Sequence, residues 1–183
     1  MKYKELKIPG LILFEPEVFE DERGFFLETW KENLFKDLIG TKYKFVQDNS
    51  STSKKNVLRG LHYQLNNPQG KLVRVSRGSI LDVVIDLRQK SEFFRESLSL
   101  EISEKNKHIL WIPPGFAHGF CAQSSIVDLH YKCTDYYDPK DELGINPIDP
   151  QLNIPWPTNN PIISKKDMSL PLLNNIDKKK LPR

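Results

Sequence analysis

The chain has 183 residues, of which 38% are hydrophobic, including 10 Phe, 6 Tyr and 3 Trp. This is enough apolar material to build one domain of ordinary size and excludes a wholly disordered protein. The 27 basic and 24 acidic residues give a net charge of +3 and are interspersed, so no nucleic-acid-binding surface is indicated. The longest apolar runs are far shorter than the roughly 20 residues of a membrane-spanning helix, and the N-terminus lacks the apolar stretch of a signal peptide. We therefore expect one domain over residues 1–183, located in the cytoplasm and without membrane contact.

Short runs rich in Val, Ile, Phe and Tyr are interrupted about every 8 to 12 residues by Gly, Pro, Asn or Ser. This spacing is typical of a β-sandwich or β-barrel, so an all-β fold is predicted. One short helix is expected at Lys31–Ile39, where apolar residues share a face and Gly40 ends the helix. In chain order, the predicted strands are Phe25–Glu28, Phe45–Asn49, Val57–Tyr63, Lys71–Arg77, Ile80–Leu87, Ser97–Ile102, His108–Ile112, Gly119–Ala122 and Ile126–Cys133.

After Tyr137 the pattern of strands gives way to a segment with many prolines, which cannot donate backbone hydrogen bonds to a sheet. We therefore expect a β-rich core over about residues 20–137 and a wrapping tail over 138–183. The two cysteines, Cys121 and Cys133, form no C-x-x-C pair, so neither a disulfide framework nor a zinc ligand set is indicated. Both are interpreted as reduced thiols in the core.

Three polar side chains lie on the apolar faces of predicted strands, because alternate residues of a strand share a face. These are His62, Lys71 and Tyr131. Each has an ordinary structural explanation, since a lysine can extend to the surface, a tyrosine can keep its hydroxyl at the rim, and a core histidine is usually hydrogen-bonded. The three together favour a shared polar pocket, because buried polar groups need partners.

Two further segments place polar groups near the same predicted strands. A Pro-Gly turn precedes His118, and the sequence RGLHYQ contains Arg59 and His62 at positions of opposite parity. If both of these side chains serve one cavity, Gly60 is predicted to mark a bulge or a close backbone approach. Arginines near strand ends suit a ligand that carries phosphate, because the guanidinium fork matches phosphate oxygens.

Six long motifs, in order along nearly the whole chain, carry a resemblance to a known family. They are EDERGFF at 20–26, FVQDNSSTS at 45–53, LRGLHYQ at 58–64, QGKLVRV at 69–75, IPPGFAHGF at 112–120 and YKCTDYY at 131–137. With these motifs the chain resembles the dTDP-4-dehydrorhamnose 3,5-epimerase family. The resemblance implies a cupin-type β jelly roll with a few short helices, assembled as a homodimer. It also implies an isomerase that acts on a dTDP-linked 4-keto-6-deoxy sugar without a metal or an organic cofactor.

The resemblance also implies roles for individual residues. His62 would be the base with Asp167 as its carboxylate partner, Tyr131 the acid, and Lys71 the cation beside the developing enolate oxygen. Tyr137, rather than Tyr136, would stack on thymine. Arg23 and Glu28 would reach the site of the neighbouring subunit. The full set of substrate-binding residues implied is Arg23, Glu28, Gln47, Asp48, Asn49, Arg59, His118, Tyr137, Glu142 and Lys166.

Three alternatives stay open from the sequence. An epimerase that inverts only C3 or only C5, or one that takes another nucleotide-linked 4-keto sugar, would share the same acid and base. A metal-dependent cupin is disfavoured because His62-Tyr63-Gln64 stands where such proteins carry H-x-H. A non-catalytic sugar-nucleotide-binding jelly roll is disfavoured because binding alone does not need an acid and a base on opposite faces.

Overall fold

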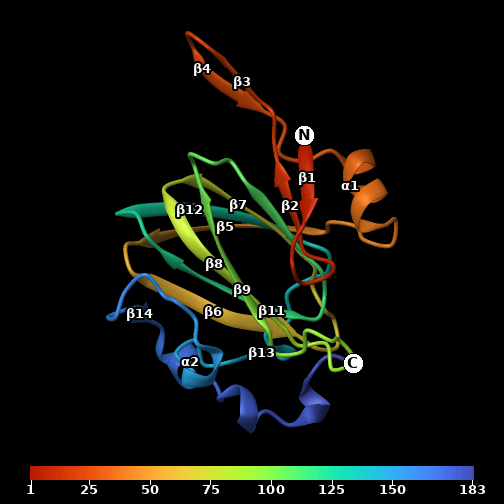
Figure 1. Ribbon diagram of the computed structural model, residues 1–183, viewed down its shortest axis with the longest axis vertical. Coiled ribbons are helices and arrows are strands. Elements are labelled where there is room, and N and C mark those ends of the chain that lie inside the picture. Colours follow the sequence, from red (N-terminus) through yellow and green to blue (C-terminus); the bar gives the residue numbers. More distant parts are fainter.

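The computed structural model describes residues 1–183 and contains two six-stranded sheets that face each other, as Figure 1 shows. The first sheet has the order β1 (Lys2–Glu5), β2 (Ile12–Glu15), β10 (Ile109–Ile112), β7 (Lys71–Arg77), β12 (Ile126–Cys133) and β5 (Gln47–Lys54). The second has the order β13 (Glu142–Gly144), β6 (Val57–Gln64), β11 (Phe116–Ala122), β8 (Ser79–Asp86) and β9 (Ser97–Ser103), and β14 (Ile162–Ile163) pairs in parallel with β6. Facing antiparallel sheets of this kind form a jelly roll, so the all-β prediction is confirmed.

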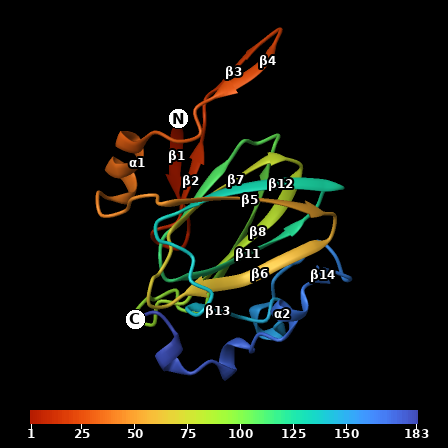
Figure 2. The same cartoon turned by 180° about the vertical axis from the view of Figure 1, so that it is seen from behind.

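The space between the sheets is filled by the inward-facing side chains, which are every second residue along each strand. Val73 and Val75 of β7 meet Ile80 and Val84 of β8 in one buried cluster. Strand β11 is buried at every residue because it lies between this interior and a second apolar layer. That layer includes Leu152, Leu173, Ile176 and Leu181 from the C-terminal segment, which crosses the outer face of the second sheet (Figure 2).

The C-terminal segment carries one short α-helix and three 3-10 turns. The helix is α2 (Lys165–Met168), and the turns are η1 (Pro150–Leu152), η2 (Leu173–Asn175) and η3 (Lys178–Lys180). No helix in the structure has both the length and the apolar character needed to cross a membrane.

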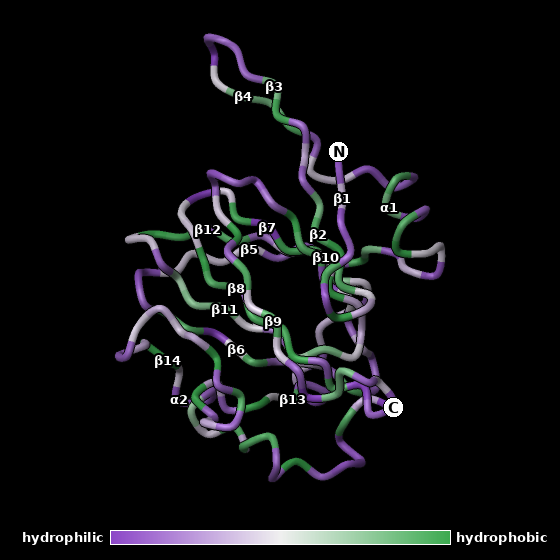
Figure 3. Tube along the Cα trace, in the orientation of Figure 1, coloured by the Kyte–Doolittle hydropathy of each residue, from purple (hydrophilic) through white to green (hydrophobic).

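The N-terminal part adds a projecting hairpin and the predicted helix. Strands β3 (Val18–Asp21) and β4 (Gly24–Leu27) pair only with each other and extend away from the sandwich (Figures 1 and 2), and the tip of this hairpin is hydrophilic (Figure 3). Helix α1 (Glu32–Ile39) forms where a helix was predicted and buries Phe35 against Phe14. Strands β1 and β2 precede residue 20, so the first sheet begins earlier in the chain than the expected core.

Candidate active site

A cavity of about 540 Å³ opens between the two sheets. Its lining comes largely from β6, β7, β11 and β12 and from residues 162–167 of the C-terminal segment. The sequence-predicted residues among its lining are Arg59, His62, Lys71, His118, Tyr131 and Asp167. The three polar side chains that the strand pattern singled out thus share one pocket. No group of three or more His, Cys, Asp or Glu side chains is arranged to hold a metal ion.

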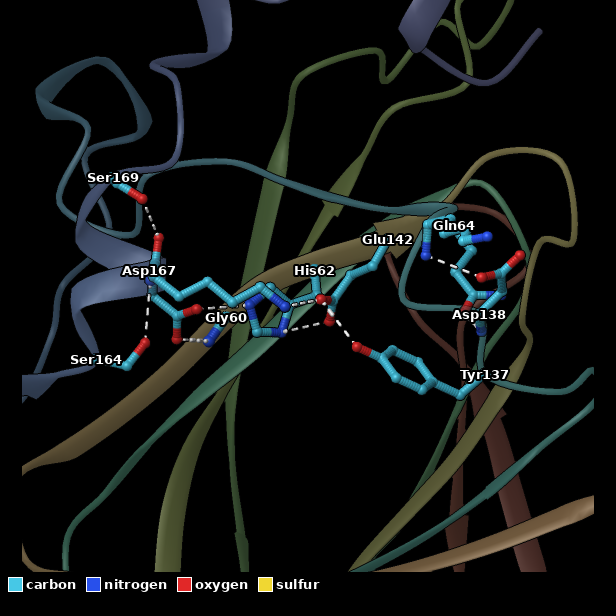
Figure 4. Close-up of polar contacts among 11 residues, drawn as sticks. Gly60, His62, Gln64, Tyr137, Asp138, Glu142, Ser164, Asp167 and Ser169 are labelled. Atoms are coloured by element: carbon cyan, nitrogen blue, oxygen red, sulfur yellow. Dashed lines mark hydrogen bonds and ion pairs between the residues drawn. The ribbon is translucent and has the colours of Figure 1, made fainter.

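His62 and Asp167 form a hydrogen-bonded pair in this cavity, shown in Figure 4. The Nε2 atom of His62 lies 2.8 Å from Oδ1 of Asp167, and the other carboxylate oxygen accepts from the backbone N–H of Gly60 at 3.3 Å. Burial alone would raise the pKa of Asp167, but the hydrogen bonds from His62, Gly60 and Ser164 outweigh it and hold that pKa below its usual range. Asp167 is therefore an ionised partner that fixes the orientation of the imidazole.

Helix α2 places Asp167. Ser164 precedes the helix in an extended conformation, and its side chain accepts a hydrogen bond from the backbone N–H of Asp167 at 3.0 Å. Ser, as an N-cap residue, satisfies a donor that the first helical turn leaves free. The position of Asp167 beside His62 is thus set by a local sequence signal, S-x-x-D, at the start of a one-turn helix.

The second ring nitrogen of His62 faces another carboxylate. Its Nδ1 atom lies 3.8 Å from Oε1 of Glu142, which belongs to β13. Glu142 also accepts a hydrogen bond from the Tyr137 hydroxyl at 3.1 Å (Figure 4). It forms an ion pair with Lys166 as well. The contact with Glu142 raises the pKa of the Lys166 ammonium. Three of the expected binding residues, Tyr137, Glu142 and Lys166, thus form one cluster at the edge of the His62 site.

Lys71 and Tyr131 lie across the cavity from His62. They belong to β7 and β12 of the first sheet, and the pairing of Tyr131 with Val73 and of Lys71 with Cys133 puts them diagonally on the same inward face. Burial raises the pKa of the Tyr131 hydroxyl, so this group stays protonated at neutral pH. Burial lowers the pKa of the Lys71 ammonium, and nearby negative groups counter that effect.

Gly60 marks the irregularity that the sequence predicted. The pairing of β6 with β11 runs from His62 opposite His118 to Arg59 opposite Phe120, so β6 carries one extra residue there. Gly60 has φ of 114°, and a Cβ at this position would lie 2.6 Å from Cα of Gly119. The bulge and the close backbone approach are confirmed, and they bring Arg59 to the same cavity as His62.

His118 has a buried partner that sequence reasoning missed. Its Nε2 lies 2.8 Å from Oδ2 of Asp82, a carboxylate with no exposed surface. The sequence did contain a signal for its burial. Asp82 lies two residues from both Ile80 and Val84 in a predicted strand, so it shares their inward face.

The remaining expected residues lie outside the lining of this cavity. Gln47 bonds to Asn49 at 3.0 Å and accepts from the backbone N–H of Tyr137 at 2.9 Å, which links β5 to the Tyr137 segment. Asp48 pairs with Lys132 at 2.5 Å and, with Asn49, lines a separate hollow of about 270 Å³. Arg23 bonds to Asp21 in the turn of the projecting hairpin, and Glu28 follows that hairpin and pairs with Lys31 at 3.6 Å. Within one chain these last two are not part of the cavity.

Comparisons with known proteins agree on one family. The sequence model described as dTDP-4-dehydrorhamnose 3,5-epimerase matches residues 5–175. A dTDP-4-dehydrorhamnose 3,5-epimerase of Shigella flexneri is 46% identical over 170 residues, which cover 92% of this chain and 94% of that protein. The crystal structure of dTDP-6-deoxy-D-glucose-3,5-epimerase from Legionella pneumophila Philadelphia 1, in complex with dTDP-4-keto-L-rhamnose, superposes with a TM-score of 0.96 at 46% identity. The superposition covers 100% of this chain and 97% of the Legionella pneumophila chain. A dTDP-4-dehydrorhamnose 3-epimerase of Streptomyces niveus is also similar, with 36% identity over 174 residues, covering 94% of this chain and 84% of that protein.

Proposed function

The chain belongs to the dTDP-4-dehydrorhamnose 3,5-epimerase family, and from this premise we propose a reaction for it and roles for its residues. The enzyme epimerises dTDP-4-dehydro-6-deoxy-D-glucose at C3 and C5 to give dTDP-4-dehydro-L-rhamnose, a step of dTDP-L-rhamnose biosynthesis. Both carbons flank the C4 ketone, so each inversion removes a proton from one face, passes through an enolate and returns a proton to the opposite face.

His62 acts as the base in this proposal. Its Nε2 is held by Asp167, which leaves Nδ1 as the atom that takes the substrate proton. Asp167 then balances the charge of the imidazolium that forms. The 3.8 Å separation between Nδ1 and Glu142 is longer than a hydrogen bond, so Nδ1 is not engaged by another group in this structure.

Tyr131 returns the proton, and Lys71 stabilises the enolate. Tyr131 belongs to the first sheet and His62 to the second, so the two groups stand on opposite walls of the cavity. This opposition is the observation that carries the proposal, because inversion needs an acid and a base on opposite faces of the sugar. A fixed ammonium is an effective partner for a developing oxyanion.

The substrate-binding assignments are also part of the proposal. Arg59 and His118 reach the sugar and diphosphate from the cavity wall, and Tyr137 stacks on thymine at the rim, supported by Gln47, Asp48, Asn49, Glu142 and Lys166. No metal or organic cofactor takes part. We keep the cytoplasmic location as a prediction, which fractionation of the expressing cells would test.

A homodimer completes the site. The hairpin β3–β4 leaves Phe19 and Phe26 exposed to 55% and 69%, although isolated two-stranded hairpins are marginally stable in water. Arg23 lies in the turn of this hairpin and Glu28 directly follows it, and neither lines the cavity of its own chain. A second copy would cover the aromatic side chains and receive Arg23 and Glu28 at its site.

The decisive experiment is proton NMR of the keto-sugar substrate with enzyme in heavy water, with the product trapped by a reductase. Incorporation of deuterium at both C3 and C5, with formation of the L-lyxo product, would support the 3,5-epimerase. Exchange at one carbon would identify a mono-epimerase, the second candidate, which the likeness to the Streptomyces niveus protein keeps open. No exchange in a folded protein would contradict the proposal.

A further inference from the structure

Asp82 is a buried carboxylate that the proposed mechanism does not yet use. It lies on β8 between the inward residues Ile80 and Val84 and has no exposed surface. Removing a carboxylate from water costs several kcal/mol unless partners compensate, so buried acidic residues are rare in an apolar interior. The partners of Asp82 therefore indicate what it does.

One oxygen of Asp82 fixes the state of a histidine in the active-site cavity. Oδ2 lies 2.8 Å from Nε2 of His118, which is itself 8% exposed. An ionised carboxylate can only accept hydrogen bonds, so Nε2 of His118 must carry the proton. The remaining polar atom of the ring, Nδ1, is then left for the cavity that His118 lines.

The other oxygen of Asp82 has no hydrogen-bond partner, although it is buried. No second hydrogen bond offsets the burial of this carboxylate, so its one side-chain partner is His118. His118 itself lines the active-site cavity.

We propose that Asp82 is a positioning residue of the epimerisation, which holds His118 protonated on Nε2 and oriented toward the substrate cavity. The inference rests on the proposed function, because it gives Asp82 its effect through His118, which that function assigns to substrate binding.

The first test compares Asp82→Asn with Asp86→Asn. Asp86 lies on the same strand and is equally buried, but it pairs with Arg88 and Ser91 and does not line the cavity. We expect Asp82→Asn to lower kcat/KM about 10- to 100-fold, the usual worth of a hydrogen bond to a charged group. Most of this loss should be a rise in KM, because His118 is assigned to substrate binding, whereas Asp86→Asn should leave KM near the wild-type value. A wild-type KM in folded Asp82→Asn would overturn the proposal.

A second measurement stands even if Asp82→Asn fails to fold. Nitrogen-15 NMR of His118 in the wild-type protein should show a proton on Nε2, and a neutral ring protonated on Nδ1 alone would refute the inference. This readout does not need turnover. Absence of deuterium exchange in the wild type would therefore count against the proposed function and leave the His118 measurement to decide the role of Asp82.

Discussion

In the proposed mechanism, the chemistry depends on His62 as the base. Replacing it with Ala removes the group that takes the substrate proton, so we expect turnover to fall about 10²- to 10⁴-fold, the usual contribution of a positioned base. The fold should persist, because His62 lines the cavity and belongs to none of the three apolar clusters. Deuterium exchange measures the loss, and His108→Ala, which changes a histidine outside the cavity, is the matched control. A folded His62→Ala protein with full activity would remove His62 from the mechanism.

The proposed role of Tyr131 can be distinguished from that of His62 by measuring two rates, the exchange of substrate protons with solvent and the formation of inverted product. In Tyr131→Phe the base is intact, so the substrate should still exchange protons with heavy water, while inverted product forms about 10²- to 10⁴-fold more slowly. Tyr63→Phe is the control, because that hydroxyl bonds to the backbone oxygen of Lys180 and burial raises its pKa to about 12. Equal losses of exchange and inversion in Tyr131→Phe would mean that Tyr131 is not the acid.

The Asp167–His62 pair predicts a pH dependence of stability. The pKa of Asp167 in the folded protein lies below its unfolded value of about 3.9. A depressed folded pKa stabilises the protein above the unfolded pKa, and that stabilisation is lost as the pH falls through the folded pKa. Urea unfolding at several pH values should therefore show the largest advantage of wild type over Asp167→Asn above about pH 4. The two stabilities should converge in acid, and a constant difference would contradict the lowered pKa.

At the scale of elements, the bulge in β6 is what lets Arg59 and His62 serve one cavity. Gly60→Ala should destabilise the protein by roughly 2–6 kcal/mol, because the new methyl meets the backbone of Gly119 while φ stays positive. Gly40→Ala is the control, since Gly40 also has a positive φ but open space around it, so only the conformational strain of about 1–3 kcal/mol is added. Denaturant unfolding measures both, and equal losses would argue against the close approach.

The sequence predicted best those strands whose two faces differ in polarity. Lys71 and Tyr131 could be assigned to the interior because they alternate with Val73, Val75 and Leu129, and the structure places them there. Strand β5 was expected at 45–49 but runs over Gln47–Lys54, because its polar sequence QDNSSTSK carries no apolar alternation and its strand conformation is fixed by pairing with β12. Asp82 was missed because nothing in a single strand shows that its partner, His118, lies on the neighbouring one.

At the scale of the whole molecule, one chain leaves its hairpin unsupported, and the proposed binding residues Arg23 and Glu28 lie outside the lining of its own cavity. The strands β3 and β4 pair with no other strand of the chain, and their outer aromatic residues are exposed. No pattern within a single sequence reports a contact between copies. The proposed dimer can nevertheless be tested directly. If each site needs residues from two chains, mixing two different inactive variants should restore part of the activity.

Arg23→Ala and His62→Ala should each lower activity when prepared alone. In a mixed dimer, the chain that carries Arg23→Ala keeps its own His62 and receives Arg23 from its partner, so one of the two sites is wild type. Mixing the two inactive variants under conditions of subunit exchange should therefore restore activity toward about a quarter of the wild-type value, since half of randomly paired dimers are mixed and each has one intact site. Turnover after mixing measures this, and two His62→Ala preparations mixed together serve as the control. If activity stays at the level of the separate variants while exchange of subunits is demonstrated, Arg23 acts within its own chain and the site is complete in a monomer.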